Sequence, residues 1–237
     1  LKMKPVQIII GSSLAYLIAN ITFSSDRVFF MTFNMGMSES QISAVLLLIT
    51  AAGVATVPFI AKIGTKVDKK DLFKTVMAVC GILMIAARVI GIESWGMMIF
   101  VCMLYAAANA TYWQLMPSMI YDVCEVEELL SGIKHSGAVI SLQALSESIS
   151  IAVGLQMLGI VLQLAGFNNE SAVQTPLALE WVQNAFAVIP GAAMILVSFI
   201  IRKSNLTKEV FNRVKEALAR RYAGEEVDIT EFEEIFE

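Results

Sequence analysis

The stretch Asn109–Ser148, NATYWQLMPSMIYDVCEVEELLSGIKHSGAVISLQALSES, joins two apolar spans through a charged segment. The charges lie between Asp122 and Lys134, and the second span retains Gln143 and Glu147 in an apolar background. Polar groups inside hydrocarbon cost free energy, so a membrane helix that keeps them usually faces protein, water or a ligand. The pattern is typical of a transporter rather than of a passive membrane anchor.

The composition indicates a membrane protein, with 57% hydrophobic residues, 16% charged residues and a mean hydropathy of +0.71. Soluble domains contain about a quarter charged residues. The apolar residues form blocks that are each long enough for the roughly 20 helical residues that cross a bilayer. The blocks are Pro5–Phe33, Gln41–Ile63, Leu72–Ile92, Gly96–Met119, Ala138–Ala165 and Trp181–Ile201. A transmembrane β-barrel would give short alternating segments instead, and none of the blocks alternates. The sequence therefore predicts an all-α membrane protein with six transmembrane helices.

Lysine and arginine residues gather at one set of ends of the predicted spans. They are Lys2, Lys4, Lys62, Lys66, Lys69, Lys70, Lys74, Lys134, Arg202 and Lys203. The connections at the opposite ends are poor in both residue types. Because positively charged loops tend to remain in the cytoplasm, we expect a multi-pass protein of the cell membrane with both termini cytoplasmic.

Two regions are predicted along the chain, a six-span membrane bundle over residues 1–203 and a cytoplasmic segment over residues 204–237. The cytoplasmic segment begins with apolar residues spaced as one face of an amphipathic helix, namely Leu206, Val210, Val214, Ala217 and Leu218. Ser204 or Asn205 is expected to cap this helix. The acidic residues 224–237 are expected to be loosely docked or disordered. The first residue is Leu1 rather than Met, which indicates the interior of a longer polypeptide.

The fifth span carries small and polar residues at helical spacing. Gln143, Ser146, Glu147, Ser150 and Gly154 fall on one stripe of a helix. Such a stripe is compatible with close helix–helix packing, in which small residues and side-chain hydrogen bonds join neighbouring spans. An ionised Glu147 would need water, a cation or a partner, which favours a functional reading of the same stripe.

The fourth span places Asn109, Tyr112, Trp113 and Met116 on one face. Aromatic rings with polar tips stack on the apolar faces of sugars, although such rings also form interfacial belts in membranes. Trp113 lies well inside the span, which favours the lining of a cavity. In the first span, Asn20 is a further polar candidate, whereas the neighbouring pair Asp26–Arg27 is expected to be a feature of the outer interface.

Other chemistry has no support in the sequence. There is no Gly-rich phosphate loop, nucleotide fingerprint or basic–aromatic patch for nucleic acid. There is also no nucleophile–base pair, metal-ligand spacing or cofactor loop, so we expect neither an enzyme nor a bound cofactor. The widely spaced Cys80, Cys102 and Cys124 indicate small apolar fillers rather than a disulfide framework.

These residues resemble the glycoside–pentoside–hexuronide:cation symporter family, the melibiose-permease type within the major facilitator superfamily (MFS). The resemblance rests on a pattern around the tenth and eleventh helices of that family. Its matching positions are Trp113, Asp122, Glu125, Ser131, Gly132, Lys134, Gly137, Ser141, Leu142 and Gln143. The basic turn Lys62–Lys70 is similar to the family's turn between helices eight and nine. The match covers the C-terminal half of the family, which is nearly the whole of this sequence.

The resemblance implies one six-helix half of an MFS transporter that rocks against an N-terminal half of six helices in the lipid. It implies cation-coupled symport, driven by Na⁺ or H⁺, of a glycoside or similar small polar solute. The substrate-binding residues that follow are Trp113, Tyr112, Gln143, Glu147, Ser148 and Asn20, where Ser148 occupies the position of a lysine common in the family. Asp122, Glu125 and Lys134 would form a cytoplasmic gate, with ion pairs that join the two halves when the inner side is closed.

Two alternatives remain open on the sequence. The chain is compatible with a transporter half for a different solute, such as a lipid or a peptide. It is also compatible with a membrane partner subunit that does not transport, because six spans alone cannot provide the second rocking half.

Overall fold

The computed structural model describes residues 3–168, 170–171 and 173–236, which form helices and connections without a strand. Six helical segments are long and apolar enough to cross a membrane. They are α1 (Lys4–Phe29) with its π-helical continuation η1 (Phe30–Asn34), α2 (Glu39–Lys66), α3 (Lys69–Ile90), α4 (Trp95–Ser131), α5 (Ser136–Leu164), and α6 (Pro176–Gln183) continued by the π-helical η2 (Asn184–Val188) and α7 (Ile189–Arg202). The prediction of an all-α protein with six transmembrane helices is confirmed. Lys2, one of the cations in the predicted charge bias, lies outside the described residues.

Local sequence explains where several helices start and end. Ser38 starts α2 with a reciprocal capping box, in which its side chain and that of Gln41 satisfy two backbone N–H groups. Ser94 accepts a hydrogen bond from the N–H of Met97 at the start of α4. At the other end of α4, Gly132 adopts a left-handed conformation with φ 74°, which is accessible to glycine at little cost.

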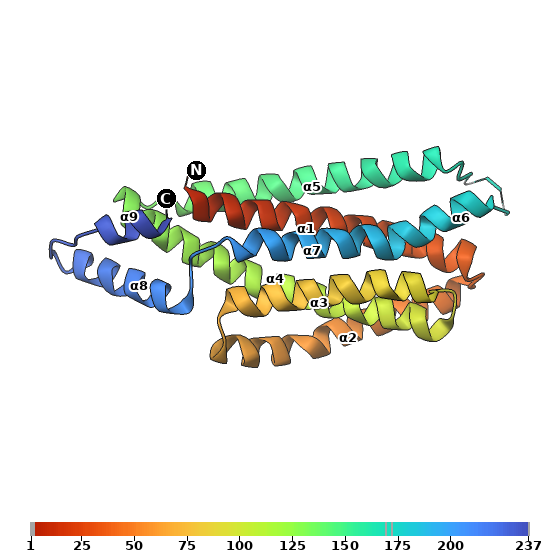
Figure 1. Ribbon diagram of the computed structural model, residues 1–237, viewed down its shortest axis with the longest axis horizontal. Helices are drawn as coiled ribbons and strands as arrows, with labels where there is room; N and C mark the ends of the chain where they lie inside the picture. Colours follow the sequence, from red (N-terminus) through yellow and green to blue (C-terminus); the bar gives the residue numbers. More distant parts are fainter. Residues whose placement is uncertain (1–2, 169, 172, 237) are drawn as a thin grey trace.

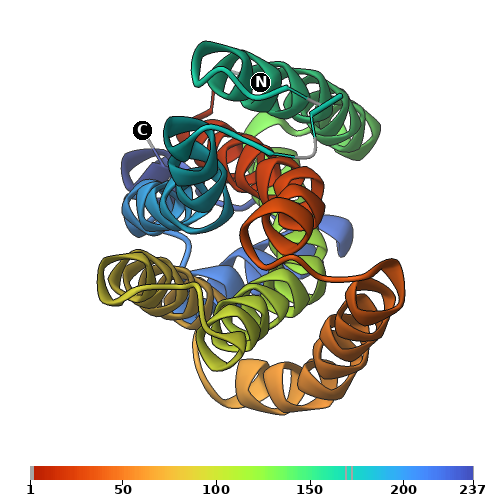
Figure 2. The ribbon, with the colours of Figure 1, turned by 90° about the vertical axis from the view of Figure 1, so that its right-hand side faces the viewer.

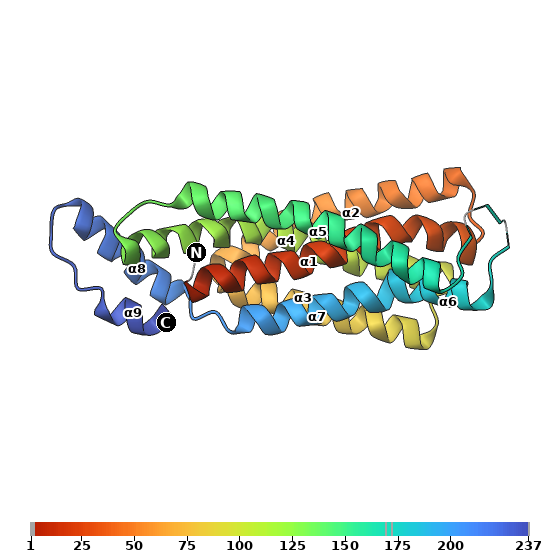
Figure 3. The same ribbon diagram turned by 90° about the horizontal axis from the view of Figure 1, so that it is seen from above.

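The helices run along the long axis of an elongated bundle (Figure 1). The first and last described residues lie at the same end, which we call the tail end, and the helices α8 (Lys208–Tyr222) and α9 (Thr230–Phe236) extend beyond it (Figures 1 and 3). Seen end on, α5 and α2 lie at the two extremes with α1 and α4 between them (Figure 2). The helices α3 and α7 lie next to each other at the left of this view. The helices α1 and α4 are therefore central in the bundle.

Two glycines allow α3 and α7 to approach closely. A Cβ atom added at Gly81 would lie 2.5 Å from the carbonyl oxygen of Gly191, and one added at Gly191 would lie 2.8 Å from the carbonyl oxygen of Gly81. Such close crossings are a frequent device of membrane helices, where small residues let two backbones touch. This contact fixes the α3–α7 side of the bundle.

The helix α4 is longer than its apolar block. The block ends at Met119, whereas α4 continues to Ser131, so most of the charged segment is helical rather than a connecting loop. Val126 and Leu129 are buried against Val214 and Leu218 of α8. This packing stabilises the additional turns of α4, although α8 lies far from α4 in the sequence.

The helix α8 begins one residue after Thr207, whose hydroxyl accepts a hydrogen bond from the N–H of Val210. The prediction of Ser204 or Asn205 as the cap was wrong. The acidic residues 224–237 were expected to be loosely docked or disordered, but Thr230–Phe236 form α9, which buries Phe232 and Phe236 against α8.

Candidate functional site

Asn109 is the centre of a hydrogen-bond network between α1 and α4. Its side-chain oxygen Oδ1 accepts hydrogen bonds from Tyr16 Oη at 3.1 Å, Asn20 Nδ2 at 2.7 Å and Trp113 Nε1 at 3.2 Å. Tyr16 is fully buried, whereas the Trp113 side chain is 50% exposed. The network therefore fixes one edge of an indole ring whose remaining surface faces away from the bundle core.

Tyr112 and Gln143 form a second network one turn further along α4. The hydroxyl oxygens of Tyr112 and Ser13 lie 2.6 Å apart, and Gln143 Nε2 donates to Ser13 Oγ at 2.6 Å and to Tyr112 Oη at 3.3 Å. Tyr112 is only 1% exposed and stacks on Tyr16 with ring centroids 4.1 Å apart. The Tyr112 hydroxyl is thus already engaged inside the bundle. The side-chain oxygen of Gln143 is buried and has no partner among the described residues.

A first hollow of about 170 Å³ lies between α4 and α5. It is lined by Tyr112, Trp113, Met116, Pro117, Ile120, Tyr121, Ile140, Gln143 and Glu147. Within the described residues, the carboxylate of Glu147 forms no hydrogen bond or ion pair. The hollow therefore combines an aromatic wall, an amide with a free oxygen and one uncompensated acidic group.

A second hollow of about 370 Å³ lies between α1, α2 and α4. Trp113 lines this hollow as well as the first, and Asn109, Ser24 and Tyr105 contribute further polar atoms. Arg27 is the charged residue in its lining, and the buried Nε of Arg27 has no hydrogen-bond partner among the described residues. Arg27 was not predicted to be a cavity residue. The signal for it was an arginine inside an apolar block, but the adjacent Asp26 made a surface pair the simpler interpretation.

The polar stripe of α5 divides into two parts. Ser150 Oγ donates to the carbonyl oxygen of Leu14 at 3.3 Å, and a Cβ added at Gly154 would lie 3.1 Å from Ile21. Ser146, Ser150 and Gly154 therefore serve close packing of α5 on α1, in agreement with the packing interpretation. Gln143 and Glu147 of the stripe line the first hollow.

Two other predicted substrate residues line neither hollow. Ser148 is exposed, its Oγ donates to the carbonyl oxygen of Ala144 on its own helix at 3.1 Å, and it lines neither hollow. Asn20 lines neither hollow and acts through Asn109. The structure thus groups Trp113, Gln143 and Glu147, and it separates Ser148 from them.

The predicted gate residues lie near the tail end but do not form one cluster. Asp122 Oδ2 lies 2.6 Å from Lys69 Nζ, so its partner belongs to this same six-helix bundle. Lys134 Nζ lies 3.8 Å from Glu128 and its side chain is 70% exposed. Glu125 forms no hydrogen bond or ion pair within the described residues.

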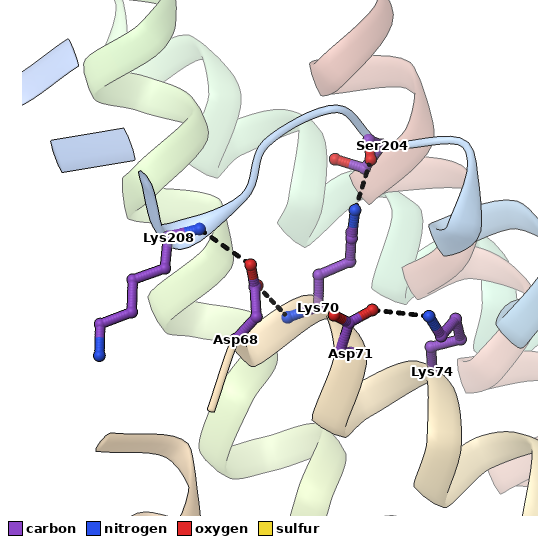
Figure 4. A network of polar contacts seen from close by, with 6 residues as sticks. All are labelled: Asp68, Lys70, Asp71, Lys74, Ser204 and Lys208. Carbon is purple, nitrogen blue, oxygen red and sulfur yellow. Dashed lines mark hydrogen bonds and ion pairs between the residues drawn. The ribbon is translucent and has the colours of Figure 1, made fainter. Parts of the chain in front are cut away.

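Asp68 connects the turn between α2 and α3 to the start of α8 (Figure 4). Its Oδ1 accepts from the backbone N–H of Lys70 at 3.1 Å, and its Oδ2 accepts from the backbone N–H of Lys208 at 2.9 Å. The ammonium group of Lys70 donates to the carbonyl oxygen of Ser204 at 3.0 Å (Figure 4). The basic turn is therefore bound to the segment that leaves the last membrane helix.

Comparison with known proteins agrees with this architecture. Residues 1–208 match the family described as MFS/sugar transport protein. The chain belongs to this family. A curated relative, the glucuronide carrier protein homolog of Escherichia coli (strain K12), is 22% identical over 217 residues, which cover 89% of this chain and 46% of the relative. The chain thus spans about half the length of the curated relative it matches.

The family resemblance predicted from the sequence is confirmed, and the fold is that of one half of an MFS transporter. The protein is a multi-pass membrane protein of a transporter family. Both hydrogen-bond networks connect α1 to α4, and residues of α4 line both hollows.

Proposed function

We propose that this chain is one half of a secondary active transporter that carries a glycoside or similar small polar solute together with Na⁺ or H⁺. The observation that supports it best is the position of Trp113, which borders both hollows and is held by Asn109 through its indole N–H. The exposed ring offers an apolar face to a sugar ring, while Gln143 and Glu147 offer acceptors for its hydroxyl groups.

The hollows support alternating access between two bundles. Closed small-molecule sites enclose roughly 300–1,000 Å³ and bury most of the ligand surface. The two hollows here, of about 170 and 370 Å³, lie at the surface of this bundle and share Trp113. A second six-helix half, in the same polypeptide or in another chain, would supply the missing wall, with the tail end of this bundle in the cytoplasm of the cell. An uncompensated Glu147 fits a wall that faces water and a partner half rather than lipid.

Uptake assays on the complete transporter test this function. Na⁺ and pH gradients are varied separately, and Glu147→Gln is compared with the wild type and with Ser148→Ala. We expect Glu147→Gln to lower solute uptake at least tenfold, since it removes the charge from the hollow, and Ser148→Ala to change it less than twofold. Equal uptake by Glu147→Gln and the wild type under both gradients would contradict the role of Glu147. A transporter of lipids or peptides, or a partner subunit without transport, would show no uptake of any glycoside tested.

Arg27 favours a second candidate, in which the solute is an acidic glycoside. The guanidinium group lines the larger hollow, no carboxylate is present in that lining, and Arg27 forms no ion pair within the described residues. Arginine binds carboxylates through two parallel hydrogen bonds. The name of the relative, glucuronide carrier protein homolog, supports the same chemistry. Competition of labelled solute uptake by glucuronate and by glucose decides between the candidates. An acidic solute predicts that Arg27→Gln abolishes the preference for glucuronate, whereas a neutral solute predicts no such preference in the wild type.

A further inference from the structure

Asp26 is a buried carboxyl group that the proposed site does not use. It lies on α1 with 0% exposed surface, and neither of its carboxyl oxygens has a hydrogen-bond partner among the described residues. On the helix it falls between Phe23 and Phe30, which both stack against Phe186 of η2. Asp26 and Arg27 were expected to form a pair at the outer interface, but the carboxyl group of Asp26 is buried inside the bundle.

Among the described residues, no cation compensates this carboxyl group. Arg27 is next to it in sequence, but successive helix residues point about 100° apart and Arg27 lines the larger hollow instead. Arg88 on α3 contacts Asn184 at 3.1 Å and Glu180 at 3.8 Å, and Glu93 accepts from Gln183 at 3.0 Å. The other charged groups at the end of the bundle opposite the tail end thus line the larger hollow, contact other partners or remain at the surface.

The helices packed around Asp26 offer few ionisable groups. The segments η1, η2 and α7 pack on α1, and the one ionisable residue in these three segments is Arg202 at the tail end. The helix α5 contains one ionisable residue, Glu147. Glu147 lies several turns nearer the tail end, because Ser150 meets Leu14 and Gly154 meets Ile21. On the facing part of α4, Cys102 and Tyr105 are the ionisable groups, and Tyr105 Oη is bonded to Ser24 Oγ at 2.9 Å.

We propose that Asp26 is the proton-binding site of this transporter, neutral while α1 and η2 are packed together and in exchange with water when they separate. An ionised carboxylate without partners is strongly disfavoured in the low-dielectric interior, so the packed state selects the protonated acid. Both α1 and the α6–α7 helix turn π-helical beside this group, at Phe30–Asn34 and Asn184–Val188. Such turns interrupt regular helical hydrogen bonding, often at functional sites, and they offer a place for the outer part of α1 to bend. The site is enclosed by this bundle alone, so a second half is not required to form it.

Infrared difference spectroscopy of the complete transporter in liposomes tests the protonation of Asp26 directly and without a solute. The spectrum of each variant is compared with that of the wild type at the same pH. Between about pH 5 and 8, where an ordinary aspartate is ionised, we expect the carbonyl band of a protonated carboxylic acid in the wild type. The band should disappear in Asp26→Asn, which is close in shape to the neutral acid, and persist in Glu147→Gln. Identical spectra of the wild type and Asp26→Asn would overturn the proposal. Thermal unfolding checks that the variant folds: its midpoint should match that of the wild type near pH 4, where an unfolded aspartate becomes protonated, and it should fall less than that of the wild type as the pH rises.

The coupling role rests on the proposed function and is tested separately, with methyl glucoside and glucuronate as probes. Asp26→Asn should exchange the transported probe between equal concentrations at a rate within twofold of the wild type. It should lose accumulation driven by a pH gradient, so that inner and outer concentrations become equal. Continued accumulation by Asp26→Asn would overturn the coupling role. Absence of transport by the wild type would contradict the proposed function instead, while the infrared comparison would still decide the protonation of Asp26.

Discussion

Lys69 at the start of α3 and Asp122 on α4 are joined by an ion pair with a Nζ–Oδ2 distance of 2.6 Å. The pair lies inside a single six-helix bundle, and the Lys69 ammonium group also lies over the ring of Phe211 on α8, 5.6 Å from its centroid. The side chains are 33% and 15% exposed, so the pair is partly shielded from water. It links α3, α4 and α8 at the tail end.

Asp122→Asn is expected to lower the stability of the bundle by about 1–2 kcal/mol, because the acceptor of this partly buried hydrogen bond loses its charge and Lys69 is left without its counter-charge. The measurement is thermal unfolding in detergent for Asp122→Asn, Lys69→Met and the double variant. The two single effects should not add, with a coupling energy of about 1 kcal/mol. Strict additivity would show that the pair contributes nothing to stability.

A gating role for Asp122, Glu125 and Lys134 stays a prediction, and altered thiol accessibility in Asp122→Asn would support it.

The glycine contact between α3 and α7 gives a second prediction. Gly81→Ala should destabilise the bundle by about 1–3 kcal/mol or prevent folding, because the added methyl group would overlap the backbone of Gly191. Gly159→Ala on α5 is the matched control, since nothing lies within 4 Å of a Cβ there and alanine favours the helix. The unfolding midpoints of the two variants should move in opposite directions. A midpoint for Gly81→Ala equal to or above that of Gly159→Ala would contradict the close crossing.

Removal of the Asn109 acceptor gives a third prediction. Asn109→Leu leaves the donors of Tyr16, Asn20 and Trp113 without their shared oxygen. Loss of a partner for a buried donor costs about 1–3 kcal/mol, and the indole ring becomes free to reorient. We expect a shift in Trp113 emission, measured with the other two tryptophans replaced by Phe, and at least a tenfold loss of solute uptake. Gln163→Leu removes an exposed amide on α5 and should leave both signals unchanged.

The start of α9 should depend on pH. Thr230 donates from its hydroxyl at 2.7 Å and from its backbone N–H at 2.9 Å to Asp228 Oδ1, and these hydrogen bonds lower the pKa of Asp228 below its ordinary value. A lowered pKa in the folded state means that the contribution of Asp228 is present above the ordinary range, near pH 4, and is lost as the pH falls below it. Proteolytic cleavage between Gly224 and Ile229 should therefore become faster in acid. The Asp228→Asn variant should be cleaved faster than the wild type at neutral pH, and its cleavage rate should change less with pH. Both proteins keep the Arg213–Glu231 ion pair, so the difference between them isolates Asp228. Equal pH profiles would refute the assignment.

The spans were predictable because hydrophobic length is a local property of the chain, and Trp113, Gln143 and Glu147 were predictable because helical spacing places them on defined faces. The extent of α4 was not, since Val126 and Leu129 are covered by the distant helix α8. The fate of Asp26 and Arg27 was also hidden from the sequence. Adjacent opposite charges suggest a surface pair, but on this helix one faces η2 and the other the larger hollow, a difference set by packing.

The carboxylate of Asp68 has a mechanical consequence, because it serves the first turn of α3 with one oxygen and the first residue of α8 with the other. The direction of α8 is thereby tied to that of a membrane helix. At its far end, Arg221 donates to the carbonyl oxygen of Leu129 on α4 at 2.8 Å, so α8 is held at both ends and moves with the bundle. The 15 residues of α8 span about 22 Å, so a tilt of the bundle by about 10° would displace the distal end of α8 by about 4 Å relative to its start. A spectroscopic label at Tyr222 would then read the rocking of the bundle from outside the lipid.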